Sequence, residues 1–175
     1  AADVPVSTST SPRGWDAFDS MCKRGRTKVI ALNDASNAGG TISDAARAAA
    51  RAREIEALSV VDAVHYALHG PIDVKAIGCD FLLCSAYKFF GPHIGVVYAR
   101  YPVLEALRTL ALSTQEPEPP FKLETGTLNH EGIAGAAAAV EFIADLGRHH
   151  ETLVADELPE GLEGRRRALV AGILA

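Results

Sequence analysis

Short, continuous apolar runs recur along the chain and predict the strands of a buried sheet. They are KVIAL at residues 28–32, LSVVDAV at 58–64, DFLLCS at 80–85 and IGVVYAR at 94–100. Runs that are apolar on both faces are typical of parallel strands with helices on either side. We therefore expect these four strands to form a mostly parallel sheet.

A helical pattern separates the first two runs. Ser43 is expected to cap a helix that ends near Ala57. The apolar positions that share one face of this helix are Ala45, Ala49, Ala52 and Ile55. A helix of this length between two strands suits a right-handed crossover, so the pattern predicts an α/β protein.

The other segments divide the chain into three parts. Residues 1–14 are crowded with Ser, Thr and Pro and are expected to be a flexible or cut end. Residues 15–150 hold the strands, a proline-rich loop at 115–120 and a small-residue helix at 132–147. Residues 151–175 are expected to begin a further helical segment that is truncated, carrying EGLEGRRRALVAGILA.

Composition narrows the classes of function. The 175 residues are 48% apolar and 22% charged, as in one ordinary globular domain. A formal net charge of -5 argues against nucleic acid as a partner. The apolar runs are too short to span a membrane, and no secretory signal is visible, so we expect a cytoplasmic protein without a membrane contact. The three cysteines lack CxxC spacing and are expected to be reduced thiols.

Polar residues follow the expected strands at the end where α/β proteins bind ligands. Asp62 ends one run, Ser85 and Lys88 follow another, and Asn37 follows a third. A lysine directly after a buried strand is costly to desolvate unless it is paired or used. Schiff-base chemistry with a cofactor aldehyde is one such use.

A longer block of sequence carries a resemblance to a known family. The block VVDAVHYALHGPIDVKAIGCDFLLCSAYKFFGPHIGVVYAR, with ASNAGGT at 35–41 and ETGT at 124–127, resembles the class V aminotransferase superfamily, in particular its cysteine-desulfurase-like branch. The resemblance extends over about residues 15–147. It implies the three-layer αβα architecture of fold-type I pyridoxal-phosphate enzymes, present here as part of the large domain.

The resemblance implies roles for four residues around the cofactor ring. Lys88 stands where the family's lysine forms the internal aldimine with pyridoxal 5'-phosphate and later moves protons at the substrate α-carbon. Asp62 matches the aspartate that pairs with the pyridine nitrogen, and a turn or capping aspartate is the alternative. His65 stands near the expected 3' oxygen of the cofactor. Asn37 is similarly placed, with a turn-forming asparagine as the alternative.

Three further residues match positions around the cofactor phosphate. Ser85 matches a hydroxyl that donates to the phosphate. Tyr87 stands where many desulfurases have a histidine, and a phenol donates a hydrogen bond without a positive charge. Thr127 matches a threonine that reaches the partner subunit's phosphate, so the resemblance implies a homodimer.

Two functions follow as alternatives. The first is a pyridoxal-phosphate enzyme that acts on a small amino-acid substrate through Lys88. The second is a truncated, non-catalytic member of the family that acts at most as a structural or dimerisation module, since the segments that bind the substrate carboxylate and carry a persulfide cysteine are not recognisable. For the expected cysteines beside a strand, Cys79 and Cys84, the expected role is that of small buried hydrophobes.

Other readings of polar clusters are weaker. His65 and His69 would share a face of an α-helix and resemble two zinc ligands, but no third ligand is near, and we expect no metal. The Arg165, Arg166 and Arg167 cluster is expected to be a solvated helix surface.

Overall fold

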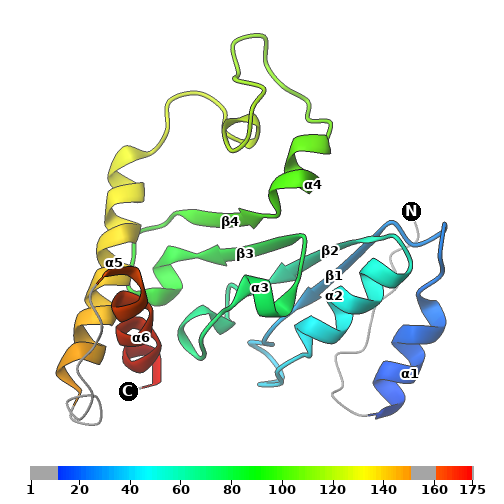
Figure 1. Cartoon of the computed structure of the whole chain (residues 1–175), viewed down its shortest axis with the longest axis horizontal. Coiled ribbons are helices and arrows are strands. Elements are labelled where there is room, and N and C mark those ends of the chain that lie inside the picture. Colours follow the sequence, from blue (N-terminus) through cyan, green and yellow to red (C-terminus); the bar gives the residue numbers. More distant parts are fainter. Residues whose placement is uncertain (1–11, 151–160, 175) are drawn as a thin grey trace. The chain divides into compact units, whose positions relative to one another are not determined.

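The computed structural model describes residues 12–150 and 161–174 (Figure 1). These residues divide into two compact units. Unit 1 comprises residues 12–65, 73–83 and 97–100, and unit 2 comprises residues 66–72, 84–96, 101–150 and 161–174.

The described strands form a four-stranded sheet in the order β1-β2-β3-β4. Their bounds are Val29–Asn33 for β1, Leu58–Asp62 for β2, Phe81–Ser85 for β3 and Gly95–Ala99 for β4. β1 pairs with β2, and β2 with β3, in parallel register. The expected α/β class and the mostly parallel sheet are confirmed.

Unit 1 contains the helices α1 (Pro12–Met21), α2 (Ala45–Glu54) and α3 (Val74–Ile77). Figure 1 shows α2 running beside β1 and β2. All four alanine and isoleucine positions expected on the inner face of the crossover helix are buried. They belong to a core in which Phe18 and Cys22 of the α1 segment pack with Ile30 of β1.

The ends of the helices differ from the expectations in three places. Asp44, not Ser43, caps α2 by accepting a hydrogen bond of 2.8 Å from the Arg47 N–H, because the Ser43 N–H is already bonded to the Asp34 carbonyl at 2.7 Å. The helix ends at Glu54 rather than near Ala57, since Glu56 has a φ of 61° that no right-handed helix contains. α1 begins at Pro12, within the stretch 1–14 expected to lack regular structure, and residues 1–11 lie outside the described part.

The strands of unit 1 are covered on one face only. Ile30 on β1 and Val61 on β2 are 6% and 0% exposed, whereas Val29, on the opposite face of β1, is 51% exposed. The apolar character of both faces predicted burial of both. In the described part of unit 1 the second face of β1 is open instead.

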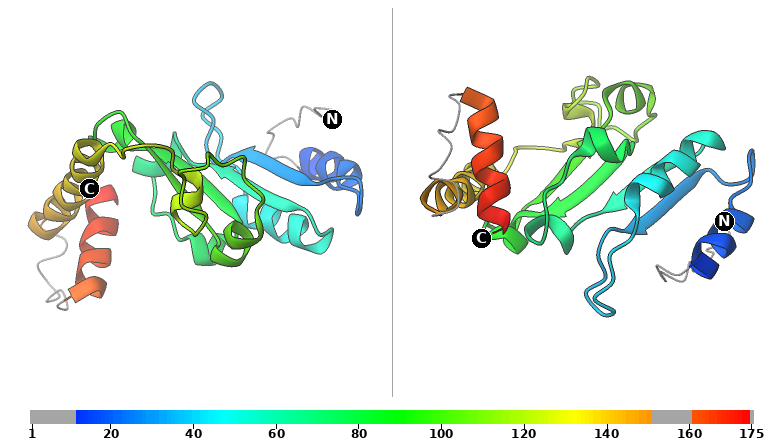
Figure 2. Two further views of the ribbon diagram at one scale, coloured as in Figure 1. Left: turned by 90° about the horizontal axis from the view of Figure 1, so that it is seen from above. Right: turned by 60° about the horizontal axis from the view of Figure 1, so that its bottom comes forward.

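Unit 2 contains α4 (Tyr101–Ala106), α5 (His130–His149) and α6 (Gly161–Leu174), together with the 3-10 helices η1 (Tyr66–Leu68), η2 (Ala86–Phe89) and η3 (Phe121–Leu123). The helices expected at 132–147 and near the C-terminus correspond to α5 and α6, and Ala175 lies outside the described residues. α5 and α6 lie side by side (Figure 2). Their approach is close because Gly147 and Gly172 lie at the contact, where an added Cβ would meet the backbone of the facing helix.

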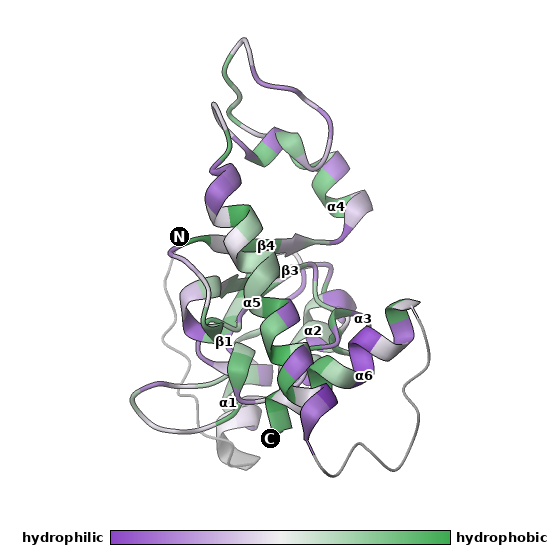
Figure 3. Cartoon of the chain, turned by 90° about the vertical axis from the view of Figure 1, so that its left-hand side faces the viewer, coloured by the Kyte–Doolittle hydropathy of each residue, from purple (hydrophilic) through white to green (hydrophobic). Residues whose placement is uncertain are grey.

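The inner face of α5 contributes to the core of unit 2. Ala139 and Ile143 of α5 pack with Ala86 and Phe89 of η2. Hydrophobic residues continue along α5 and α6 beyond this contact (Figure 3). Within residues 12–150 and 161–174, no helix has both the length and the hydropathy needed to cross a membrane.

Candidate functional site

Asp62 ends β2, as expected, and its backbone is held on both sides. Its carbonyl oxygen accepts a hydrogen bond of 2.8 Å from the Asp34 N–H, and the N–H of the following Ala63 donates to the Leu83 carbonyl at 2.8 Å. The Asp62 Oδ1 accepts a hydrogen bond of 3.0 Å from the Val64 N–H. This bond is the turn interaction of the alternative interpretation, and it also orients the carboxylate at the end of the strand.

Asn37 and His65 lie elsewhere in unit 1. Asn37 is exposed in a turn that is closed by hydrogen bonds from the Gly40 N–H to the Ser36 carbonyl and from the Ser36 N–H to the Thr41 carbonyl, both 2.9 Å. That position suits the turn-forming alternative, and a role of Asn37 toward a cofactor stays a prediction. His65 is partly buried and lies three residues after Asp62.

The zinc alternative loses its geometric basis. The residues after His65 form the short 3-10 helix η1 rather than an α-helix, so the α-helical face that would present His65 and His69 together is not formed. Among the residues that the structure describes, no group of three His, Cys, Asp or Glu side chains gathers as a metal ion would require.

Two buried carboxylates of unit 1 were not singled out from the sequence. Asp34 is 5% exposed, and burial raises the pKa of its carboxyl group. Asp80 is 7% exposed, and burial alone would raise its pKa, but hydrogen bonds from Ser59 and Arg100 outweigh burial and hold the pKa below its ordinary value. Polar residues at the borders of apolar strands were the available signal, but such residues are usually turn formers.

Ser85, Tyr87 and Lys88 lie together in unit 2, at the end of β3 and in η2. Ala86 and Phe89 take the inner positions of this turn and are 0% and 8% exposed. Tyr87 and Lys88 occupy the outer positions between them and are exposed, with the Lys88 Nζ 5.2 Å from the Tyr87 ring centroid. The Ser85 hydroxyl makes no capping hydrogen bond to η2, which leaves its proton available for a ligand.

The exposure of Lys88 corrects one argument made from the sequence. We expected this lysine to be desolvated because it follows a buried strand. The side chains of Ala86 and Phe89 fill the buried positions of the turn, so the Lys88 amine lies in solvent in the described structure. Its candidacy therefore rests on its position and on the family resemblance.

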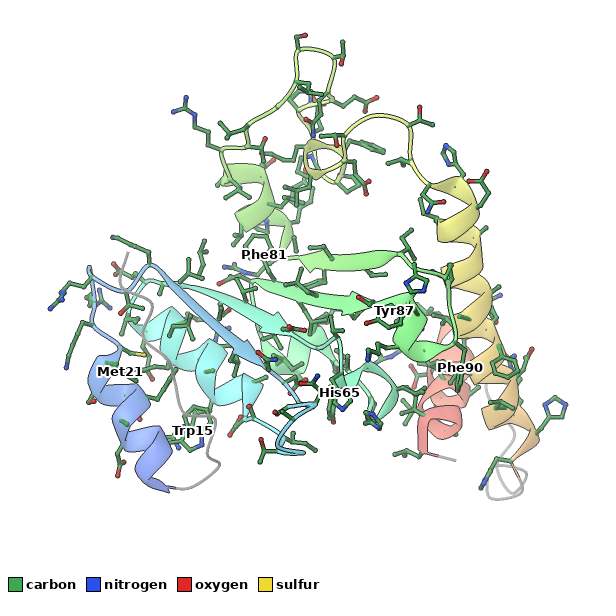
Figure 4. All side chains as sticks on the ribbon, turned by 180° about the vertical axis from the view of Figure 1, so that it is seen from behind. Trp15, Met21, His65, Phe81, Tyr87 and Phe90 are labelled. Carbon is green, nitrogen blue, oxygen red and sulfur yellow. The ribbon has the colours of Figure 1, made fainter. Side chains whose placement is uncertain are left out.

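The backbone of the turn after Lys88 is tightly closed. The Gly91 N–H donates to the Ala86 carbonyl at 2.8 Å, and an added Cβ on Gly91 would lie 2.8 Å from the Ala86 Cβ. Phe90 has a φ of 66°, unusual for an aromatic residue, and its ring packs edge-on against Phe142 of α5 at 5.9 Å. Figure 4 shows Tyr87 and Phe90 projecting from this turn. The turn thus presents Lys88 from a fixed backbone.

His93 joins this group and was missed in the sequence. Its ring stacks on Tyr87 with centroids 4.9 Å apart and 15° between the planes. The two residues are brought together across a closed turn, which leaves no periodic spacing to reveal the contact. The Gly91-Pro92 pair before His93 was the available signal, since it indicates that the chain reverses there.

Thr127 lies in another segment of unit 2. It is exposed and follows Gly126, whose φ of 71° bends the chain shortly before Asn129 caps α5. An exposed position fits a residue that reaches a partner subunit, and that role stays a prediction.

The cysteines have the environment expected of small hydrophobic residues. Cys22 and Cys79 are buried and Cys84 is partly buried. Burial raises the pKa of all three thiols. A raised pKa keeps each thiol protonated and unreactive at neutral pH.

Comparison with known proteins gives one consistent family. The model of the family "Aminotransferase class-V" matches residues 4–171. A cysteine desulfurase of Klebsiella pneumoniae subsp. pneumoniae is 36% identical over 135 residues, which are 70% of this chain and 33% of the relative. The chain thus matches about a third of the length of such curated relatives.

Solved structures show the same likeness in three dimensions. The apo structure of a cysteine desulfurase from Thermococcus onnurineus NA1 is similar with a TM-score of 0.63 and 32% identity, over 69% of this chain and 33% of that one. The cysteine desulfurase CsdA from Escherichia coli is similar with a TM-score of 0.64 and 30% identity, over 81% of this chain and 41% of that one. The expected fold, part of the large domain of a fold-type I enzyme, is confirmed.

The family match covers most of the chain and includes the strand ends and the turn that carry Asp62, Ser85 and Lys88. The chain belongs to the aminotransferase class-V family, a family of pyridoxal-phosphate-dependent enzymes.

Proposed function

We propose that this chain is a pyridoxal-phosphate-binding part of a class V enzyme that acts on an amino acid. The observation that carries the proposal is the turn after β3, which presents the Lys88 amine in solvent beside the Ser85 and Tyr87 hydroxyl groups. Cysteine is the first substrate to consider, because the relatives are named cysteine desulfurases.

The residues present fit the chemical groups of the cofactor. An accessible amine such as that of Lys88 suits an aldehyde, and the uncapped Ser85 hydroxyl suits a phosphate oxygen. A carboxylate such as Asp62, oriented by its bond from Val64, suits a protonated pyridine nitrogen. These donors and acceptors match the three polar parts of pyridoxal phosphate.

Each residue then has a defined task. When bound, pyridoxal phosphate draws electrons away from the substrate α-carbon. Asp62 keeps the proton on the ring nitrogen, and His65 donates to the 3' oxygen. Lys88 holds the cofactor through Nζ and, once released by the substrate amine, takes the proton from the α-carbon and returns it.

The phosphate is held by neutral donors in this proposal. Ser85 and Tyr87 donate hydrogen bonds to it, and Asn37 lies at the cofactor ring. Thr127 donates to the phosphate bound by a second copy of the chain, so the proposed working form is a homodimer.

The chain's own thiols are not proposed to receive sulfur. Burial raises the pKa of Cys22, Cys79 and Cys84, and a protonated thiol is a poor nucleophile. If cysteine is the substrate, we expect the released sulfur to go to a thiol outside this chain.

An absorbance titration with pyridoxal phosphate tests the proposal. The wild-type chain is expected to develop a visible band from cofactor bound to Lys88, and Lys88→Ala is expected to abolish it. Lys75→Ala is the matched control, because Lys75 is an exposed lysine on α3. A wild-type chain that forms a dimer but takes up no cofactor would contradict the proposal and favour the structural-module alternative.

A further inference from the structure

We propose that His93 is a positioning residue for the cofactor phosphate, acting through Tyr87. In this proposal, which rests on the proposed function, the imidazole holds the Tyr87 ring so that the phenol hydroxyl donates to the phosphate. The inference begins from the stack of the two rings, whose centroids lie 4.9 Å apart with an angle of 15° between the planes.

Tyr87 has little else to hold it. It is 45% exposed, while its neighbours Ala86 and Phe89 fill the core of unit 2. An exposed tyrosine exchanges among side-chain rotamers, and each rotamer carries the hydroxyl to a different place. A stacked ring restricts this motion and keeps the donor in one position.

The backbone around His93 is fixed and therefore able to provide that restraint. The Ile94 N–H donates to the Pro92 carbonyl at 2.8 Å, and the Ile94 carbonyl accepts from the Ala86 N–H at 2.9 Å. Residues 92–94 are thus tied to the first residue of η2. Pro92 also lies close to α5, since a Cβ added to Gly135 would be 3.0 Å from the Pro92 Cγ.

The position of the Tyr87 ring also affects the lysine. The Lys88 Nζ lies 5.2 Å from the Tyr87 ring centroid, within the range of a cation–π contact. His93, Tyr87 and Lys88 therefore form a connected set in which the imidazole is the member attached to the loop after η2. A tyrosine that takes the place of a cationic phosphate ligand gains its orientation from this neighbour.

A double-mutant cycle distinguishes positioning from ordinary surface packing. The dissociation constants of pyridoxal phosphate and of pyridoxal, which lacks the phosphate, are measured for the wild-type chain, His93→Ala, Tyr87→Phe and the double variant. His93→Ala is expected to weaken the binding of pyridoxal phosphate about threefold to tenfold, the size of one lost aromatic pair, and to leave pyridoxal unchanged. In the Tyr87→Phe background, His93→Ala is expected to have no further effect, because the hydroxyl it positions is absent.

Two further variants complete the design. His93→Phe keeps a ring for stacking and is expected to restore the affinity. His149→Ala is the matched control, because His149 is an exposed histidine of unit 2 whose ring nitrogen lies 2.7 Å from the Asp145 carbonyl oxygen.

The outcomes separate this inference from the proposed function. Equal losses for pyridoxal phosphate and pyridoxal, additive effects in the cycle, or no effect of His93→Ala would each overturn the positioning role while the wild-type chain still binds the cofactor. A wild-type chain that does not bind pyridoxal phosphate would contradict the proposed function and the inference together.

Discussion

At the scale of single residues, two buried carboxylates of unit 1 have opposite environments. The N–H groups of Ser43 and Asp34 are occupied in backbone hydrogen bonds around Asp34, and burial raises the pKa of its carboxyl group. Asp80 accepts a hydrogen bond of 2.9 Å from the Ser59 N–H and two from the Arg100 guanidinium at 2.9 and 2.6 Å, and its pKa is lowered. The two acids therefore give pH dependences of opposite sign.

For Asp34 we predict that charge removal stabilises the fold. Because its folded-state pKa is raised, the folded state holds the proton more tightly, and the stability falls as the pH rises through the folded pKa. Asp34→Asn is expected to raise the free energy of unfolding at neutral pH by about 1 kcal/mol and to have no benefit in acid. Urea unfolding across the pH range measures this. A loss of stability at neutral pH would show that the carboxylate has a stabilising partner.

For Asp80 we predict the reverse. Its folded-state pKa is lowered, so its contribution is present above the unfolded pKa and disappears as the pH falls through the folded value. Asp80→Asn is expected to cost about 2 kcal/mol at neutral pH, since charged hydrogen bonds to Ser59 and Arg100 are lost. The same unfolding series checks it, with equal losses at neutral and acidic pH as the contradicting result.

Strand ends were the part of the site that the sequence predicted well. An apolar run that stops at Asp62 and another that stops at Ser85 place both residues at the ends of β2 and β3, as the structure shows. Ring stacking of His93 on Tyr87 and burial of Asp34 depend on how a loop folds back, which no local spacing encodes. Ser43 and Asp44 are both good caps, and only the backbone bond of Ser43 decides between them.

At the scale of elements, the contact of α5 with α6 depends on two glycines. A Cβ on Gly147 would lie 2.6 Å from the Gly172 nitrogen and would clash with the Ala168 carbonyl oxygen. These obstacles are backbone atoms and cannot rotate away. Gly172 is restricted in the same way by the backbone of α5.

Gly147→Ala is therefore predicted to loosen α6. The substitution gains about 1 kcal/mol of helix propensity in α5, but crowding costs about 1–3 kcal/mol at the contact. We expect a net loss of stability and faster amide hydrogen exchange in α6. Gly95→Ala is the control, since nothing lies within 4 Å of an added Cβ there. Unchanged exchange in α6 would contradict this packing.

The elements themselves followed from the sequence more fully than their burial. Each of the four apolar runs became a strand within two residues of its expected bounds, because β-branched and apolar residues favour extended backbone wherever the sheet forms. Coverage of a strand depends on what packs over it. The open face at Val29 is therefore not readable from the run KVIAL.

At the scale of the whole molecule, both units expose apolar side chains. Val29 and Val97 of unit 1 are 51% and 52% exposed, and Phe90 and Phe142 of unit 2 are 65% and 49% exposed. Exposed apolar surface of this kind promotes association. It agrees with the homodimer that the proposed role of Thr127 requires.

We predict that the purified chain self-associates. Sedimentation velocity over a concentration series is expected to show a dimer that dissociates on dilution, because burial of apolar surface drives the association. Thr127→Ala is expected to leave the dimer intact and to weaken cofactor binding. A chain that stays monomeric at all concentrations would contradict the dimer.

The most direct test of the central claim is to trap the cofactor on the chain. The wild-type protein is incubated with pyridoxal phosphate, reduced with borohydride, digested and mapped by peptide mass. The account predicts one dominant modified peptide, SAYKFFGPHIGVVYAR or a part of it, with the added mass on Lys88. Modification spread over the surface lysines with no preference for Lys88 would contradict the claim that this turn holds the cofactor.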